Sequence, residues 1–173
     1  DMLGAEENSD LRLFTSLMNP LTVDQSVLRT SLIPGIMATV KTNMSHEVRD
    51  LRLFEWGKTF IRKEGDQQPT EKNCLAAIMT GLCQEKSWYD DERHCDCYDI
   101  KGAVEALLRA LGLGGFRFQR KNGFPGLDPE VSSGIYCSDR LIGQVGMVAS
   151  SVIEAYDLKN ERAYLFELDV EAL

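Results

Sequence analysis

The chain has 173 residues, a length that fits one domain or one large module able to bury a core without a disulfide or a metal. Apolar residues make up 43% of it, which is ordinary for a globular protein. With 19 basic and 27 acidic residues the net charge is −8. This charge argues against broad, sequence-independent binding to nucleic acids, because such binding relies on clustered Lys and Arg.

The apolar runs, the N-terminus and the cysteines indicate the compartment. No stretch of about 18 consecutive apolar residues occurs, so no membrane span is expected. The segment from Asp1 to Glu7 has no basic region followed by an apolar one, so it is not a secretory signal, and the missing initiator Met suggests an excised fragment. The five irregularly spaced cysteines do not resemble a disulfide framework, which favours the reducing cytoplasm.

The first third of the chain predicts a strand and then a helix. Leu11 to Met18 has the pattern of a strand, which the following Asn-Pro pair ends because proline cannot donate to a ladder. Apolar residues then recur at helical spacing from Leu32 to Asn43. Ser31 is the expected N-cap of this helix, and Pro34 is tolerated in its first turn.

A strand, a loop and a second strand are predicted next. Leu51 to Ile61 carries apolar side chains on both faces, which is typical of a central strand covered on both sides. The polar stretch from Arg62 to Asn73 predicts a loop, and Leu75 to Thr80 predicts the returning strand.

The remaining elements complete an α+β pattern. A helix is expected from Ile100 to Leu111, with Asp99 as its N-cap and Gly112 just after its end. The remaining expected elements are a strand at Phe116 to Arg120, a hairpin of Gly134 to Cys137 with Leu141 to Met147, a short helix capped by Ser150, and a last strand at Ala163 to Val170. This order predicts a mostly antiparallel sheet flanked by helices. The expected core residues are Leu53, Phe54, Trp56, Ile78, Leu107 and Phe166.

Four stretches, in order, resemble one family. Residues 19–34 read N-P-L-T-V-D-Q-S-V-L-R-T-S-L-I-P, and residues 49–60 read R-D-L-R-L-F-E-W-G-K-T-F. Residues 98–111 read Y-D-I-K-G-A-V-E-A-L-L-R-A-L, and the closing segments are 142–158 and 164–173. Together these stretches resemble the catalytic-core-like module of the bacterial-type phenylalanyl-tRNA synthetase β chain. The family-motif structural positions are Asn19, Pro20, Arg29, Ser31, Pro34, Glu55, Gly57, Asp99, Lys101 and Gly102.

The resemblance implies a fold and a role. It implies that residues 1–173 form a single module with a fold like the class II aminoacyl-tRNA synthetase core, as part of a longer β chain. It implies a non-catalytic structural and interaction module that packs against the α chain in a cytoplasmic heterotetramer of two α and two β chains. The assembled ligase would charge its tRNA with phenylalanine using ATP and magnesium. No cofactor is expected in this chain itself.

Two departures and two weak candidates concern catalysis. The family usually has a His-Pro-Gly-Arg-Ser-Ala loop, where this chain has Asp128 to Ser133, and it often has His-Pro-Glu where this chain has Ala149 to Ser151. Class II enzymes hold the ATP phosphates with two arginines, for which Arg62 and Arg117 are superficial candidates. Arg117 follows a helix and enters a strand, the reverse of the required context, so we expect neither ATP nor phenylalanine to bind here.

The cysteines and two charged residues leave alternatives open. Cys74, Cys83, His94, Cys95 and Cys97 raise the question of zinc, but their spacing is not that of paired knuckles, which favours packing and predicts no zinc. Glu55 lies among apolar residues and needs a partner, for which Arg29 is a candidate; the alternative is that Glu55 lines a solvated remnant of an active-site cleft.

Three functional hypotheses therefore compete. The first is the structural module, the second a self-sufficient class II ATP-binding enzyme, and the third a small zinc-dependent binding module. The first predicts an exposed apolar patch near Leu11 to Met18 or on the helix from Leu32 to Val40, where the chain would associate with itself or with the α chain.

Overall fold

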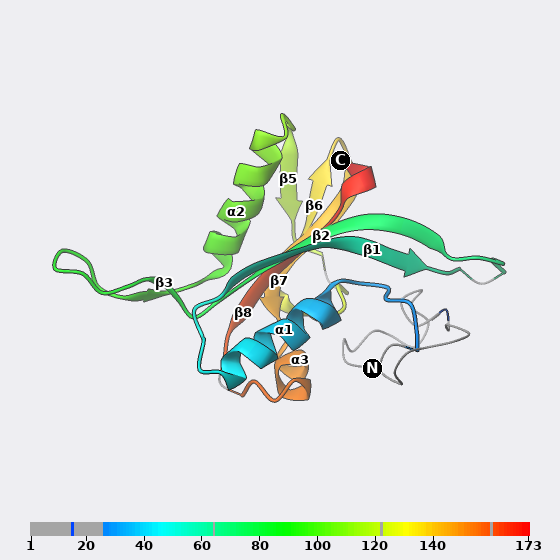
Figure 1. Cartoon of the computed structure of the whole chain (residues 1–173). Helices are drawn as coiled ribbons and strands as arrows, with labels where there is room; N and C mark the ends of the chain where they lie inside the picture. Colours follow the sequence, from blue (N-terminus) through cyan, green and yellow to red (C-terminus); the bar gives the residue numbers. More distant parts are fainter. Residues whose placement is uncertain (1–14, 16–25, 64, 122, 160) are drawn as a thin grey trace.

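A single antiparallel sheet organises the described part of the chain (Figure 1). The computed structural model describes residues 15, 26–63, 65–121, 123–159 and 161–173. The helices are α1 (Ile33–Ser45), α2 (Cys97–Ala110), α3 (Ser150–Ala155) and the 3-10 turn η3 (Val170–Ala172). The strands are β1 (Arg52–Ile61), β2 (Thr70–Thr80), β3 (Leu82–Gln84), β4 (Arg93–His94), β5 (Phe116–Gln119), β6 (Leu127–Cys137), β7 (Arg140–Val148) and β8 (Ala163–Asp169).

Among the described residues, six strands form the main sheet in the order β1-β2-β8-β7-β6-β5, and every neighbouring pair is antiparallel. The predicted α+β architecture is confirmed. Helices α1 and α3 lie on one side of the sheet and α2 on the other, as Figure 1 shows. Strands β3 and β4 form a separate short ribbon at the base of a hairpin that extends away from the sheet.

Two apolar clusters fill the two sides of the sheet. On the α1 side, Ile36, Met37 and Val40 pack with Ala76 and Ile78 of β2. On the other side, Ile100, Val104 and Leu108 of α2 pack against β7 and β8. The predicted core residues Ile78 and Phe166 are buried. Leu53 and Leu107 are half-buried at the margins of the clusters.

The prediction that the strand from Leu51 to Ile61 is central and covered on both sides is wrong. In the described sheet β1 is one of the two edge strands, and Phe54 and Trp56 are 78% and 59% exposed. Helix α2 covers β7 and β8 and does not extend over β1, so the outward side chains of β1 have no covering layer among the described residues. Apolar residues on both faces of a strand therefore did not mean that both faces are covered.

The loop predicted from Arg62 to Asn73 is shorter than expected, because β2 begins at Thr70. The polar residues at the start of β2 pair with the end of β1, with Glu71 opposite Phe60. Lys58 Nζ lies 2.6 Å from a Glu71 carboxylate oxygen. Polar residues are compatible with a strand here because the hairpin is largely exposed at this end.

The helix starts differ from their predicted caps. Helix α1 has Leu32 at its N-cap position, and Ser31 lies one residue earlier. Asp99 is not the N-cap of α2, which begins at Cys97; Asp96 caps it, and Asp99 completes a reciprocal capping box three residues later. Ser150 is the first helical residue of α3, after an Ala149 cap that makes no side-chain bond.

The predicted C-terminal hairpin is confirmed, with β6 beginning earlier, at Leu127, than expected. Ser138 and Asp139 at its turn have φ values of 45° and 68°. Two consecutive left-handed residues match the right-handed twist of the paired strands. The last predicted strand is β8, and no helix among the described residues is long and apolar enough to cross a bilayer. The predicted strand from Leu11 to Met18 falls outside the described residues, apart from Thr15.

Candidate functional site

An arginine clamps the start of α1 to the edge of the sheet. The guanidinium of Arg29 pairs with Glu55, and its Nε donates to the carbonyl oxygen of Lys58 at 2.8 Å. The backbone N–H of Phe60 in turn donates to the carbonyl of Arg29 at 2.9 Å. Arg29 therefore satisfies part of the outer edge of β1, and Glu55 has the partner that its apolar neighbours required.

Glycine at position 57 makes room for this clamp. A Cβ on Gly57 would collide with the Arg29 guanidinium and would approach Leu32 Cδ2 to 3.3 Å. Glu55 keeps a 30% exposed side chain but does not line the nearby cleft. The structure thus favours the ion-pair alternative for Glu55 over the solvated cleft.

The half-buried Glu167 on β8 holds the first turn of α1 through its carboxylate. It accepts a hydrogen bond from the backbone N–H of Leu32 at 2.7 Å and from Ser31 Oγ at 3.0 Å. Gln144 Nε2 on β7 donates to its other oxygen at 3.2 Å. Burial raises the pKa of Glu167, while these hydrogen bonds favour its charged form and oppose that shift.

Pro34 completes the junction between α1 and α3. Its carbonyl oxygen accepts a hydrogen bond from the Tyr156 hydroxyl at 3.1 Å. The motif positions Arg29, Ser31, Pro34, Glu55 and Gly57 therefore act together to fix α1 on the sheet. Asn19 and Pro20 lie outside the described residues.

A cleft of about 340 Å³ lies beside this junction. Its lining residues are Thr30, Ser31, Thr59, Ile61, Lys72, Cys74, Phe124, Pro125, Leu141, Ile142, Gly143, Gln144, Glu167 and Asp169. Lys72 is paired with Asp169 at 2.6 Å, so the cleft's ammonium group is already neutralised. Burial raises the pKa of the Cys74 thiol, which keeps it protonated rather than nucleophilic at neutral pH.

The two arginine candidates for phosphate binding are elsewhere. Arg62 donates to the carbonyl of Asp66 at 3.2 Å in the turn between β1 and β2. Arg117 on β5 pairs with Asp139 at 2.6 Å and lies over the Tyr136 ring. Neither lines the cleft, so the described residues do not bring the two arginines together at one site.

The segment that replaces the family's His-Pro-Gly-Arg loop lies in β6. Its Glu130 pairs with Arg120 at 2.7 Å, and Asp128 accepts from the Glu130 backbone N–H at 2.8 Å. The register of β6 against β7 shifts in this stretch, between Leu127 and Ser132. The segment is therefore an acidic, irregular strand in this chain.

The second group of motif positions lies at the start of α2. Asp99 receives both terminal nitrogens of Arg93, each at 2.8 Å, and the backbone N–H of Asp96 at 2.8 Å. The hydrogen bonds from Arg93 hold the pKa of the Asp99 carboxyl well below its usual range. Lys101 Nζ lies 4.9 Å from the centre of the Phe118 ring and forms an ion pair with Glu105 Oε1 at 3.5 Å. A Cβ on Gly102 would meet no atom within 4 Å, so nothing in the structure explains that glycine.

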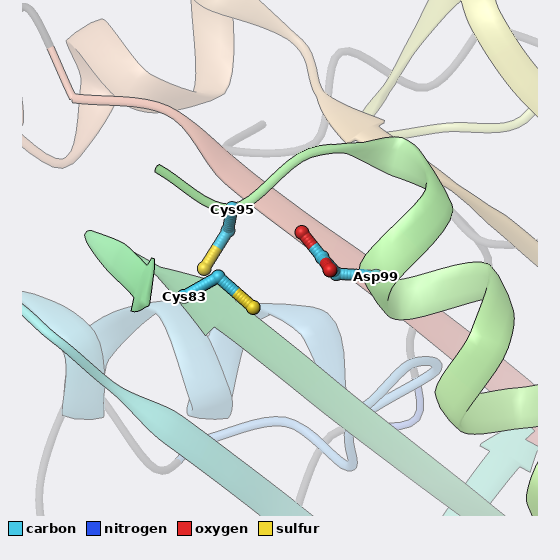
Figure 2. A group of neighbouring side chains, drawn as sticks. All are labelled: Cys83, Cys95 and Asp99. Atoms are coloured by element: carbon cyan, nitrogen blue, oxygen red, sulfur yellow. The ribbon is translucent and has the colours of Figure 1, made fainter. Parts of the chain in front are cut away.

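Two cysteines join Asp99 in a compact group (Figure 2). The sulfur atoms of Cys83 and Cys95 and a carboxylate oxygen of Asp99 all lie within 4.8 Å of one another. His94 and Cys97, which the sequence analysis considered with them, are not in the group. Sequence spacing missed Asp99 as a member, because it counted only histidine and cysteine.

Glu167 and Gln144 were also missed. The signal for Glu167 was present, since it is a charged residue inside the apolar strand β8, the same argument that pointed to Glu55. Its partners lie more than 130 residues earlier in the chain, at Ser31 and Leu32, so no local pattern identifies them.

Comparison with known proteins points to one family. A family model described as the phenylalanyl tRNA synthetase beta chain CLM domain matches residues 1–170. The phenylalanine–tRNA ligase beta subunit of Syntrophus aciditrophicus is 38% identical over 173 residues, which is 100% of this chain and 21% of that protein. The beta subunit of Geobacter sulfurreducens is 34% identical over 172 residues, 99% of this chain and 21% of that protein. The chain thus spans about a fifth of the length of these relatives.

A solved structure shares the fold. The pyrrolysyl tRNA synthetase PylSc of Desulfitobacterium hafniense matches with a TM-score of 0.64 at 15% identity, covering 88% of this chain and 50% of that one. At 15% identity this structural similarity shows that the two chains share the fold of a class II synthetase, and it shows nothing about the chemistry of this chain.

Proposed function

Because the chain belongs to the phenylalanyl-tRNA synthetase β-chain family, we propose that it is a non-catalytic structural and interaction module of a phenylalanine–tRNA ligase. The observation that carries the proposal is the cleft next to Glu167. Its charged lining residues are two carboxylates and one lysine that is already paired. Such a lining repels a polyphosphate instead of stabilising it.

The ligase activity itself is proposed for the assembled enzyme. Charging tRNA with phenylalanine would take place with ATP and magnesium on the α chain, in a cytoplasmic assembly of two α and two β chains. This chain would contribute a folded support. The support for this division is the dispersal of Arg62 and Arg117, each of which binds a local partner.

The role as an interaction module rests on exposed aromatic surface. Phe54 and Trp56 project from β1 beside the partly buried Leu75 and Ala77 of β2, which lie opposite them in register. An aromatic strand face without a covering layer is typical of a surface that meets a partner. We propose that this surface contributes to the subunit's contacts within the ligase. It replaces the helix from Leu32 to Val40 as the expected patch, because that helix's apolar residues are buried.

Calorimetry with ATP and with phenylalanine tests the absence of catalysis. We expect no measurable heat of binding for either ligand. Micromolar ATP binding that is abolished by Arg62→Ala, and retained by the control Arg120→Ala, would contradict the proposal. Arg120 is a suitable control because it is also an exposed arginine in an ion pair.

Size-exclusion chromatography with and without the α chain tests the interaction role. The variant is Phe54→Glu, and the matched control is Val48→Glu, since Val48 is also exposed but lies in the connection between α1 and β1. We expect the first substitution to weaken co-elution with the α chain and the second to leave it unchanged. Equal co-elution of both variants would show that this face does not serve the assembly.

A further inference from the structure

Three side chains of types that can bind metals lie close together at the base of the β3–β4 hairpin. Cys83 comes from β3, Cys95 from the segment between β4 and α2, and Asp99 from the first turn of α2, as Figure 2 shows. Their ligand atoms lie within 4.8 Å of one another. The proposed ligase role does not use any of the three.

The spacing of the cysteines and His94 predicted no zinc, but the folded group reverses that expectation: we propose that Cys83, Cys95 and Asp99 bind one thiophilic divalent cation of the zinc class, with a water molecule as the fourth ligand. Two sulfurs and one carboxylate oxygen form a donor set that suits zinc. Ligand atoms bound to zinc at about 2.0–2.3 Å lie roughly 3.5–3.8 Å apart at tetrahedral angles. The three ligand atoms, within 4.8 Å of one another, are therefore at most about 1 Å further apart than a bound ion requires.

The surroundings of Asp99 fit this role. Metal-bound carboxylates are commonly oriented by further hydrogen bonds, and Asp99 is held by Arg93 and by the backbone N–H of Asp96. Its Oδ1 accepts from Arg93 at 2.8 Å, and a carboxylate oxygen has a second lone pair for the metal. Two thiolates and one carboxylate together balance the charge of the dication and of the Arg93 guanidinium.

The group of Cys83, Cys95 and Asp99 is accessible from solvent. Cys83 is exposed, and Cys95 lines a surface hollow of about 630 Å³ through which an ion can enter. Burial raises the pKa of the Cys95 thiol. Binding replaces two S–H bonds with two metal–sulfur bonds and releases two protons, so affinity falls as the pH is lowered.

A bound ion would anchor the hairpin. Strands β3 and β4 have three and two residues and an irregular register, and so short a ribbon is marginal by itself. The hairpin carries Trp88 and Tyr89 at 94% and 70% exposure. An ion at Cys83, Cys95 and Asp99 joins the base of this aromatic arm to α2 and fixes its direction.

Metal titration of the complete natural protein, reduced and stripped with a chelator, tests the site. We expect one Co²⁺ per chain, with a thiolate-to-cobalt charge-transfer band that Zn²⁺ abolishes. Cys83→Ser should weaken zinc binding by about 10-fold to 100-fold or more, since it removes a ligand. Because Cys83 is exposed, this variant is expected to fold, which circular dichroism verifies. The matched control is Cys137→Ser, whose thiol faces the carbonyl of Gly114 elsewhere.

Three outcomes would overturn the proposal. The first is less than stoichiometric binding in the reduced protein. The second is binding that is equally strong in Cys83→Ser, or that is lost in Cys137→Ser. The third is a Cys83–Cys95 disulfide under mild oxidation together with no ion uptake by the reduced protein, which would make the pair a redox couple. None of these outcomes bears on ATP binding or on association with the α chain, so the proposed function stands or falls separately.

Discussion

The two faces of the sheet differ in how completely the chain covers them. On the α1 side, β1 and β2 meet a helix whose Leu32, Ile33 and Met37 are at most 1% exposed. On the α2 side, cover reaches β7 and β8 but leaves Phe54 and Trp56 of β1 in contact with solvent. The same strand is thus a core element on one face and a surface element on the other. This contrast teaches that burial of a strand face is decided by where the covering helix lies.

The uneven cover also separates stability from assembly. Residues on the α1 face are held by packing and by bonds to Glu167 and Arg29, so substitutions there should act on folding. On the open face of β1, Phe54 and Trp56 are largely exposed, so substitutions there should act on association. Each of the following measurements sharpens or breaks this division.

The largest expected effect is on the covered face. Ile78→Ala removes a fully buried side chain between β2 and α1, and should lower the free energy of unfolding by about 3 kcal/mol. Phe54→Ala, on the open face, should change it by less than about 0.5 kcal/mol. Urea unfolding of the two variants measures both. Similar losses for the two would show that the faces do not differ as described.

The next effect concerns the carboxylate of Glu167. Glu167→Ala removes the acceptor for the buried Ser31 hydroxyl and Leu32 N–H, and should cost about 2 kcal/mol at neutral pH. Urea unfolding again provides the measurement. Ser31→Ala leaves the Leu32 bond to Glu167 intact and should cost less. A larger loss for Ser31→Ala would mean that the carboxylate is not the principal cap.

The same carboxylate predicts a pH dependence. Burial raises the pKa of Glu167 above its ordinary value of 4.5, so the folded chain takes up a proton here before the unfolded chain does. Unfolding free energy therefore increases, in this contribution, as the pH falls through the raised pKa toward 4.5. Glu167→Gln removes the contribution. The difference between wild type and Glu167→Gln should thus move in favour of wild type on acidification, and the opposite trend would contradict the shift.

The smallest effects compare two glycines. Gly57→Ala displaces the Arg29 guanidinium from Glu55 and Lys58 and should cost about 1 kcal/mol. Gly102→Ala adds a methyl group to an open position inside α2 and should stabilise the chain by about 0.5–1 kcal/mol, because glycine is a poor helix former. Thermal unfolding should show a lower melting temperature for Gly57→Ala and a higher one for Gly102→Ala. If Gly102→Ala also weakened association with the α chain, a partner would approach the helix there.

Local pattern predicted α1, α2 and the six strands of the main sheet, although not all of their bounds, and it did not predict β3 and β4. Helices α1 and α2 were predicted from apolar residues three and four positions apart, a spacing that can be seen in the sequence without knowledge of the fold. Asp96 and Asp99 are both residue types that cap helices, and Asp99 was predicted as the N-cap of α2. Their different roles become clear only in the folded capping box. The exposure of Phe54 depends on the position of α2, which no residue of β1 encodes.

The candidate site was predicted in the same uneven way. The Arg29–Glu55 pair was one of two alternatives, drawn from the cost of leaving a charge among apolar neighbours, and the structure favours it. The partners of Glu167 and the group of Cys83, Cys95 and Asp99 depend on contacts made by the folded sheet and hairpin. Neither composition nor residue spacing determines such contacts, which form only when the distant segments pack together.

The bonds between Ser31 and Glu167 have a consequence for synthesis of the protein. They join residues 136 positions apart, and Tyr156 reaches Pro34 across 122 positions. Contacts of such long sequence separation form slowly, because most of the intervening chain must be ordered first. On the ribosome, α1 would emerge well before β8, and its apolar stripe would wait without a partner. We therefore expect this region to depend on chaperones during translation more strongly than its stability alone suggests.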